Sequence, residues 1–136
     1  MLRTSNKEYP IEVKNNRLRT NIGRHLIEVI DFYPIVKGFQ VVIRGTEQGL
    51  EFTSITSPLV SLKEGAGFMV CTQHSTYTFM VKNGCLQTIY GHYAIAVTEL
   101  HGLVPGERLT VKGNRLGISG EIPCQFITSP IVEILP

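Results

Sequence analysis

Four side chains in the second half of the chain are the most capable of chemistry: Cys71, His74, Cys85 and His92. Thiolates and imidazoles bind zinc, and a cysteine beside a histidine can act as a nucleophile. If the flanking strands are regular, Cys71 and His92 lie on one face and His74 and Cys85 on the other. No second CxxC or HxxxH motif and no nucleophile elbow accompanies them. We therefore expect no catalytic residue, no metal and no cofactor, with an enzyme or metal protein using these four residues as an alternative.

Basic side chains form a second group, which could contact an anion or nucleic acid. Residues 1–25 hold six lysines and arginines against two glutamates, although the net charge of the chain is only +2. Nucleic-acid binding also needs aromatic side chains beside the basic ones, and Tyr9 is expected to point into the core. Nucleic acid is therefore an alternative partner and not the favoured one. The candidate contacts are Lys14, Arg17, Arg19, Arg24, Arg44, Lys82, His92 and Lys112.

The elements that must position these residues recur along the chain. A shift of 68 residues aligns YPIEVKNNRLRTNIG, from Tyr9, with YTFMVKNGCLQTIYG, from Tyr77. Fourteen of the first 45 residues are then identical to their partners, whereas ordinary composition would give about three. The hexapeptides ITSPLV (55–60) and ITSPIV (127–132) also align once four residues are inserted. The sequence predicts two tandem copies of one unit, at residues 1–66 and 67–136.

A hairpin is the clearest element of the predicted unit. Asn83-Gly84 indicates a type I′ turn, because both residue types tolerate positive φ, and Asn15-Asn16 is the weaker equivalent in the first copy. This turn places Lys82 opposite Cys85 and puts alternate apolar residues of the two strands on one core face.

The remaining segments of each copy are also predicted to be strands. Residues 24–33 alone fit a helix or a strand, but Ile27 and Val29, the apolar positions that recur identically in the second copy, lie two apart and favour a strand. Glycines bound short strands at 38–45 and 106–113. Each ITSP segment marks an edge or a bend in the last strand, because proline cannot donate to a sheet ladder.

Together these elements predict a mostly β fold with little or no helix. We expect two tandem copies of a five-stranded unit of roughly 65 residues that form small barrels or rolled sheets. The short connection between the copies favours one compact body with pseudo-two-fold symmetry.

The outer faces of the two predicted hairpins differ in character. In the first copy this face is polar and basic, whereas in the second it carries Met80, Cys85 and Ile89. Apolar side chains on an outer face indicate contact with another molecule. We therefore expect a non-enzymatic binding or assembly protein that acts through its surfaces, as a homo-oligomer or with a protein partner.

Composition narrows the remaining classes. No apolar run approaches the roughly 20 residues of a membrane helix, so no membrane partner is expected. The segment MLRTSNKEYP lacks the apolar stretch of a signal peptide, and the three cysteines show no paired spacing, so we expect a cytoplasmic protein. Neither GxGxxG nor GxxxxGK[ST] is present, which argues against a phosphate-binding loop.

Overall fold

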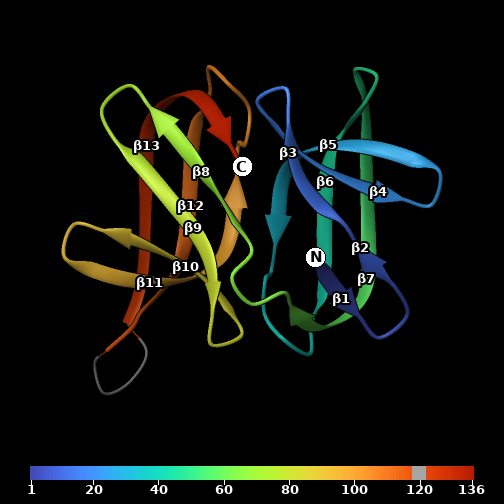
Figure 1. Cartoon of the computed structure of the whole chain (residues 1–136), viewed down its shortest axis with the longest axis horizontal. Coiled ribbons are helices and arrows are strands. Elements are labelled where there is room, and N and C mark those ends of the chain that lie inside the picture. Colours follow the sequence, from blue (N-terminus) through green and yellow to red (C-terminus); the bar gives the residue numbers. More distant parts are fainter. Residues whose placement is uncertain (118–121) are drawn as a thin grey trace.

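The computed structural model describes residues 1–117 and 122–136, and the regular elements there are all β-strands (Figure 1). Among these residues no helix is found that is long and apolar enough to cross a membrane. The strands are β1 (Leu2–Thr4), β2 (Glu8–Tyr9), β3 (Ile11–Lys14), β4 (Arg17–Ile22), β5 (His25–Tyr33), β6 (Gln40–Glu47), β7 (Leu50–Leu62), β8 (Gly67–Thr72), β9 (Thr76–Lys82), β10 (Cys85–Tyr90), β11 (Tyr93–His101), β12 (Arg108–Arg115) and β13 (Ile122–Leu135).

All thirteen strands belong to one antiparallel sheet. In the second half, strands β8 to β13 pair in chain order, and β13 returns to pair with β8, which closes a ring of six strands. The first half pairs in a similar order, with β7 returning to β1. There β2 and β3 together take the place of β9, and Pro10, which has no N–H to donate, separates them.

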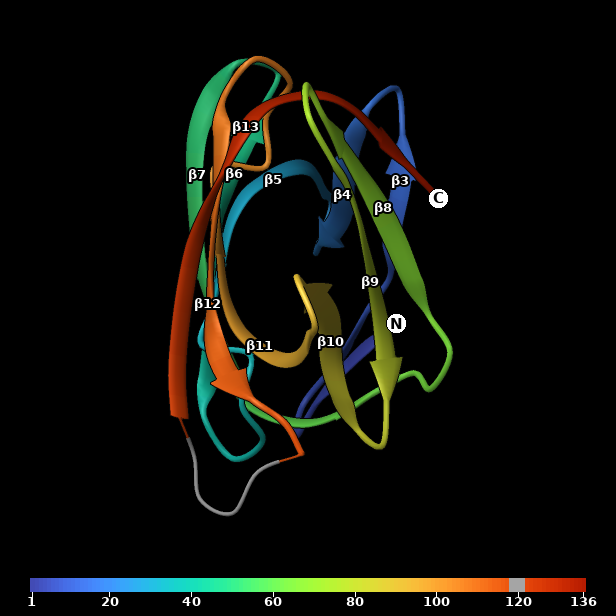
Figure 2. The same cartoon turned by 90° about the vertical axis from the view of Figure 1, so that its left-hand side faces the viewer.

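Strands β5 and β11 join the two halves by pairing with each other. Phe32 opposes Leu100, and Asp31 opposes His101. The pairing makes β13, β12, β11, β5, β6 and β7 neighbours in one continuous stretch of sheet. Figure 2 shows these strands on one side of the molecule, with β3, β8 and β9 on the opposite side. The two halves therefore share a wall and lie side by side (Figure 1).

The hairpin prediction is confirmed. Asn15 and Asn16 have φ of 53° and 60°, and Asn83 and Gly84 have φ of 52° and 78°, as a type I′ turn requires. Lys82 opposes Cys85 as expected. Segment 25–33 is a strand, so the preference for strand over helix is correct.

The first ITSP segment forms a bulge inside a strand with neighbours on both sides, and not an edge. The pairing of β6 with β7 shifts register between Gln40 and Val42, opposite this segment. Thr56 Oγ1 accepts the buried N–H of Val41 at 3.1 Å and donates to the carbonyl of Ser57 at 2.6 Å. The threonine hydroxyl thus takes up a backbone donor beside the bulge, where the ladder is disturbed.

The second ITSP segment repeats the same bonds. The N–H of Leu109 donates to Thr128 Oγ1 at 3.1 Å, and that hydroxyl donates to the carbonyl of Ser129 at 2.7 Å. Ser129 Oγ in turn donates to Thr72 Oγ1 at 2.9 Å, which ties β13 to the end of β8. The motif is therefore a structural corner in both halves.

Glycine is required at two further bulges. Register shifts between Val29 and Asp31 in β5, and at the matching place in β11. Gly45 and Gly113 lie opposite these bulges, and a Cβ at either would overlap the backbone carbonyl of Glu28 or Ala96. This close approach explains why both strands keep a glycine where a side chain would otherwise strengthen them.

The predicted count of five strands per unit is wrong. The first half has seven strands, β1 to β7, and the second has six, β8 to β13. The prediction omitted the opening strand of each half, β1 or β8, because MLRTSNKEYP is polar and lacks a clear period of two. Leu2 is nevertheless fully buried, and its backbone pairs with both β2 and β7.

Candidate functional site

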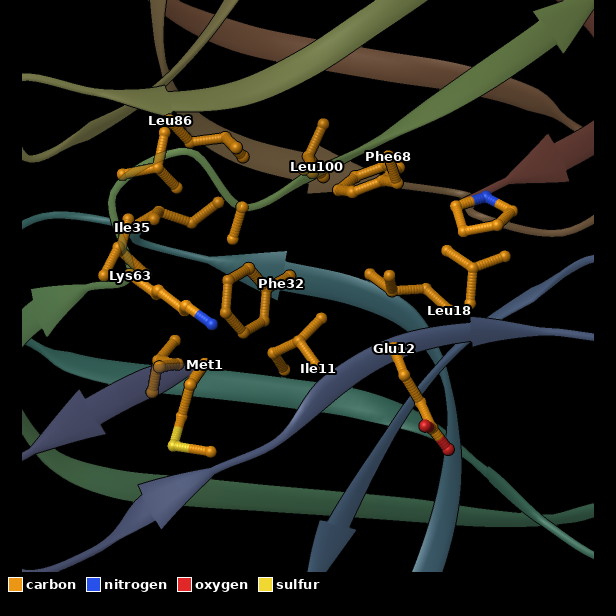
Figure 3. A pocket seen from close by; sticks show the side chains of 17 residues that line it. Met1, Ile11, Glu12, Leu18, Phe32, Ile35, Lys63, Phe68, Leu86 and Leu100 are labelled. Atoms are coloured by element: carbon orange, nitrogen blue, oxygen red, sulfur yellow. The ribbon is translucent and has the colours of Figure 1, made fainter.

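A cavity of about 270 Å³ lies between the two halves (Figure 3). The seam strands β5 and β11 contribute Phe32 and Leu100, and hairpin residues of both halves contribute the sides. Its lining is almost entirely apolar and comprises Met1, Leu2, Ile11, Glu12, Val13, Leu18, Phe32, Ile35, Leu62, Lys63, Ala66, Gly67, Phe68, Val81, Leu86, Leu100 and Pro136.

Strand alternation aims these side chains at the cavity. In β3, Ile11 and Val13 are partly buried, whereas Glu12 between them is exposed. On β4, Leu18 is buried directly opposite Val13. The hairpin of the second half presents a matching buried valine and leucine. The walls are therefore built by two similar hairpins that face each other across the seam.

Lys63 and Glu12 are the only charged side chains among the lining residues that the structure describes. Lys63 lies in the connection between β7 and β8, and its side chain extends toward the ring of Phe32 (Figure 3). The carboxylate of Glu12 points away from the cavity in the same view. Partial burial, and then the positive charge of Lys63, lower the pKa of the Met1 α-ammonium group, whereas Glu8 raises it. One cationic side chain thus lies at the rim.

A charged cluster occupies the other face of the seam. Asp31 is mostly buried and accepts hydrogen bonds from Arg44 Nη1 and, at 3.2 Å, from the N–H of Gly102. Asp31 Oδ1 also lies 3.3 Å from His101 Nδ1, and the other ring nitrogen, Nε2, lies 2.9 Å from Glu99 Oε1. An imidazolium would donate to both carboxylates. The cluster links β5 and β6 to β11, so it fastens the two halves together.

Sequence reasoning missed most of this cluster. Asp31 and Glu99 are 68 residues apart, as are Tyr33 and His101, whose rings lie 4.8 Å apart across the seam. The chemical likeness of the acidic pair was a usable signal. The meeting of Tyr33 with His101 was not foreseeable, because nothing local specifies that β5 pairs with β11.

The predicted basic contacts do not form one free basic surface. Arg17 and Arg19 lie 3.8 and 3.7 Å from the two carboxylate oxygens of Glu28, and Arg44 contacts Asp31. The others lie on separate elements: Lys14 and Lys82 end β3 and β9, Arg24 and His92 occupy turns, and Lys112 is within β12. The observed pairing places carboxylates against three of the eight candidates.

The predicted chemical quartet is likewise spread out. Cys71 lies in β8 and His74 in the turn before β9, whereas Cys85 follows the turn at the far end of β9. A strand of that length separates them by about 20 Å. In the described ranges, no three His, Cys, Asp or Glu side chains are grouped closely enough to hold a metal ion.

The structure brings Met80 and Ile89 of the predicted interface together. Both line a shallow hollow on the outer face of β9 and β10, where they are 37% and 67% exposed. Cys85 is only partly exposed, and its thiol donates weakly to the carbonyl of Lys82 at 3.5 Å.

Comparison of the chain with family models, with curated proteins and with solved structures finds no match.

Proposed function

We propose that this chain is a non-enzymatic binding protein whose site is the cavity between the two halves. The observation that carries the proposal is an empty volume of about 270 Å³ lined almost wholly by apolar side chains from both halves. Close-packed interiors contain few voids larger than one water molecule. Ligand sites are typically concave, apolar and placed where two structural units meet.

The cavity volume limits the ligand to a small molecule. If a heavy atom takes about the space of a water molecule in the liquid, the cavity holds an apolar group of about nine heavy atoms. Filling it would restore dispersion contacts that its lining side chains lack.

Internal duplication supports the placement of the site. We propose that residues 1–66 and 67–136 descend from one unit and pack around a pseudo-two-fold axis. Two backbone bonds across the seam support this, because each is the other shifted by 68 residues: Ile35 N–H donates to Thr98 O at 2.7 Å, and Leu103 N–H donates to Ile30 O at 2.9 Å. The cavity would then lie where equivalent hairpins face each other.

Binding of naphthalene, an uncharged molecule of suitable size, tests the proposal. Equilibrium dialysis with fluorescence detection should show saturable binding near one molecule per chain. Ala66→Phe, which places a ring at the cavity rim, should weaken binding at least tenfold, because it occupies the same volume. Ile89→Ser on the outer hollow is the matched control and should leave binding unchanged.

Two results would overturn the proposal. Naphthalene that does not bind folded wild-type protein would show that the cavity is not a site. Loss of binding in Ile89→Ser, with Ala66→Phe unaffected, would place the apolar molecule on the outer hollow of β9 and β10.

The outer hollow favours a second function, self-association. We propose that copies of the chain meet through this face, because Met80 and Ile89 expose apolar area side by side. Sedimentation at micromolar concentration should show a multimer that Met80→Asp or Ile89→Asp weakens. Leu26→Asp, at another exposed leucine, should leave the multimer intact. A wild-type monomer would contradict this second proposal and leave the cavity proposal standing.

A further inference from the structure

The rim of the cavity carries one sign of charge. Ile11 and Val13 face inward, so strand alternation turns Glu12 away from the volume they line. Lys63 is not part of a strand, and its side chain crosses the cavity entrance toward Phe32 (Figure 3). No salt bridge of Lys63 with a carboxylate is found within residues 1–117 and 122–136. Its ammonium is available to a bound anion.

The interior offers nothing to a polar group. Apart from Lys63 and Glu12, the described lining side chains are aliphatic, aromatic, thioether or proline, or are absent as in Gly67. A hydroxyl or amide deep in this volume would lose its hydrogen bonds to water and gain none. A ligand that fits must therefore be apolar along its length and polar at the end that reaches the rim.

We propose that the ligand is a medium-chain carboxylic acid, with its alkyl chain in the cavity and its carboxylate beside Lys63. This inference rests on the proposed binding function. A chain of about eight carbons matches the volume, and Phe32 and Leu100 form the apolar seam against which it packs. A lysine acts as a single point charge, which suits a compact, singly charged head group.

Four ligands of equal chain length separate the contributions of tail and head group: octanoate, 1-octanol, octylamine and octyl phosphate. Each is titrated against naphthalene-loaded protein below its micelle concentration. We expect octanoate to displace naphthalene at about one-fifth of the concentration that 1-octanol needs, the gain typical of a partly exposed ion pair. Octylamine should be the weakest of the four.

Substitutions at Lys63 test the head-group contact directly. Lys63→Met should abolish the preference for octanoate and leave the affinity for 1-octanol unchanged, because it removes the charge and keeps an apolar stem. Lys63→Glu should reverse the order and favour octylamine. Lys112→Met, on β12 and outside the cavity lining, is the control and should behave as the wild type does.

The outcomes distinguish this inference from the function on which it rests. Displacement by octanoate and 1-octanol at equal concentrations, unchanged in Lys63→Met, would refute the carboxylate contact while the cavity remained a binding site. Tighter binding of octyl phosphate than of octanoate would refute the assignment of a singly charged head group. Failure of naphthalene and of all four ligands to bind would overturn the proposed function itself.

Discussion

Four buried threonines allow the same substitution to be predicted with opposite signs. Thr56 and Thr128 are each 2% exposed, and their hydroxyls accept backbone N–H groups at the two ITSP corners. Thr20 and Thr88 are 1% and 2% exposed, and within the described residues their hydroxyls have no hydrogen-bond partner. Replacement by valine keeps the shape of the side chain and removes only the hydroxyl.

The free energies follow from what each hydroxyl does. Thr56→Val leaves the N–H of Val41, which is fully buried, without its partner, so it should lower the free energy of unfolding by about 2 kcal/mol. Thr128→Val should cost the same amount. Thr20→Val and Thr88→Val each remove an unpaired polar group and should raise the free energy of unfolding by about 1 kcal/mol.

Urea unfolding followed by circular dichroism measures all four variants under one condition. At this chain length, about 3 °C per kcal/mol is expected in parallel thermal melts. Exposed Thr53, on the same strand as Thr56, is the control, and Thr53→Val should change little. Equal losses of stability in all four buried variants would refute the reasoning, because the ITSP hydroxyls would then have no special role.

Three further variants extend the account, each measured by urea unfolding. Gly45→Ala and Gly113→Ala should each cost about 3 kcal/mol, because a Cβ meets backbone that cannot move aside; a cost below 1 kcal/mol would show that the bulges adapt. Asp31→Asn should cost about 1–2 kcal/mol, since it weakens the contact with Arg44 across β5 and β6; no loss would remove the cluster from the account of the seam. Asn16→Gly should add about 0.5 kcal/mol, because glycine adopts its φ of 60° without strain; a loss would contradict the turn assignment.

Local chemistry made several elements predictable from the sequence. The Asn-Gly and Asn-Asn turns fix hairpin register through positive φ, and register then decides which residues face the core. Likewise, the recurrence of Ile27 and Val29 resolved a segment that is ambiguous by itself. In each case the information lies within a few residues or in the comparison of the two halves.

Features that depend on distant strands were not predictable. The pairing of Phe32 with Leu100 arises when the two halves close on each other, and no local pattern specifies it. The cavity is a volume left between side chains 68 or more residues apart, so composition cannot reveal it. Arg17 and Arg19 were read as candidate contacts because their neighbour Glu28 comes from another strand.

Methyl NMR of the wild-type protein during titration with octanoate tests the central claim most directly. Ile11, Ile35 and Leu86 line the cavity, whereas Ile89 and Ile127 are exposed on outer faces. The account predicts saturable shifts of the cavity methyl signals and none at the two exposed isoleucines. Shifts confined to Ile89 or Ile127, or no shifts at all, would contradict it.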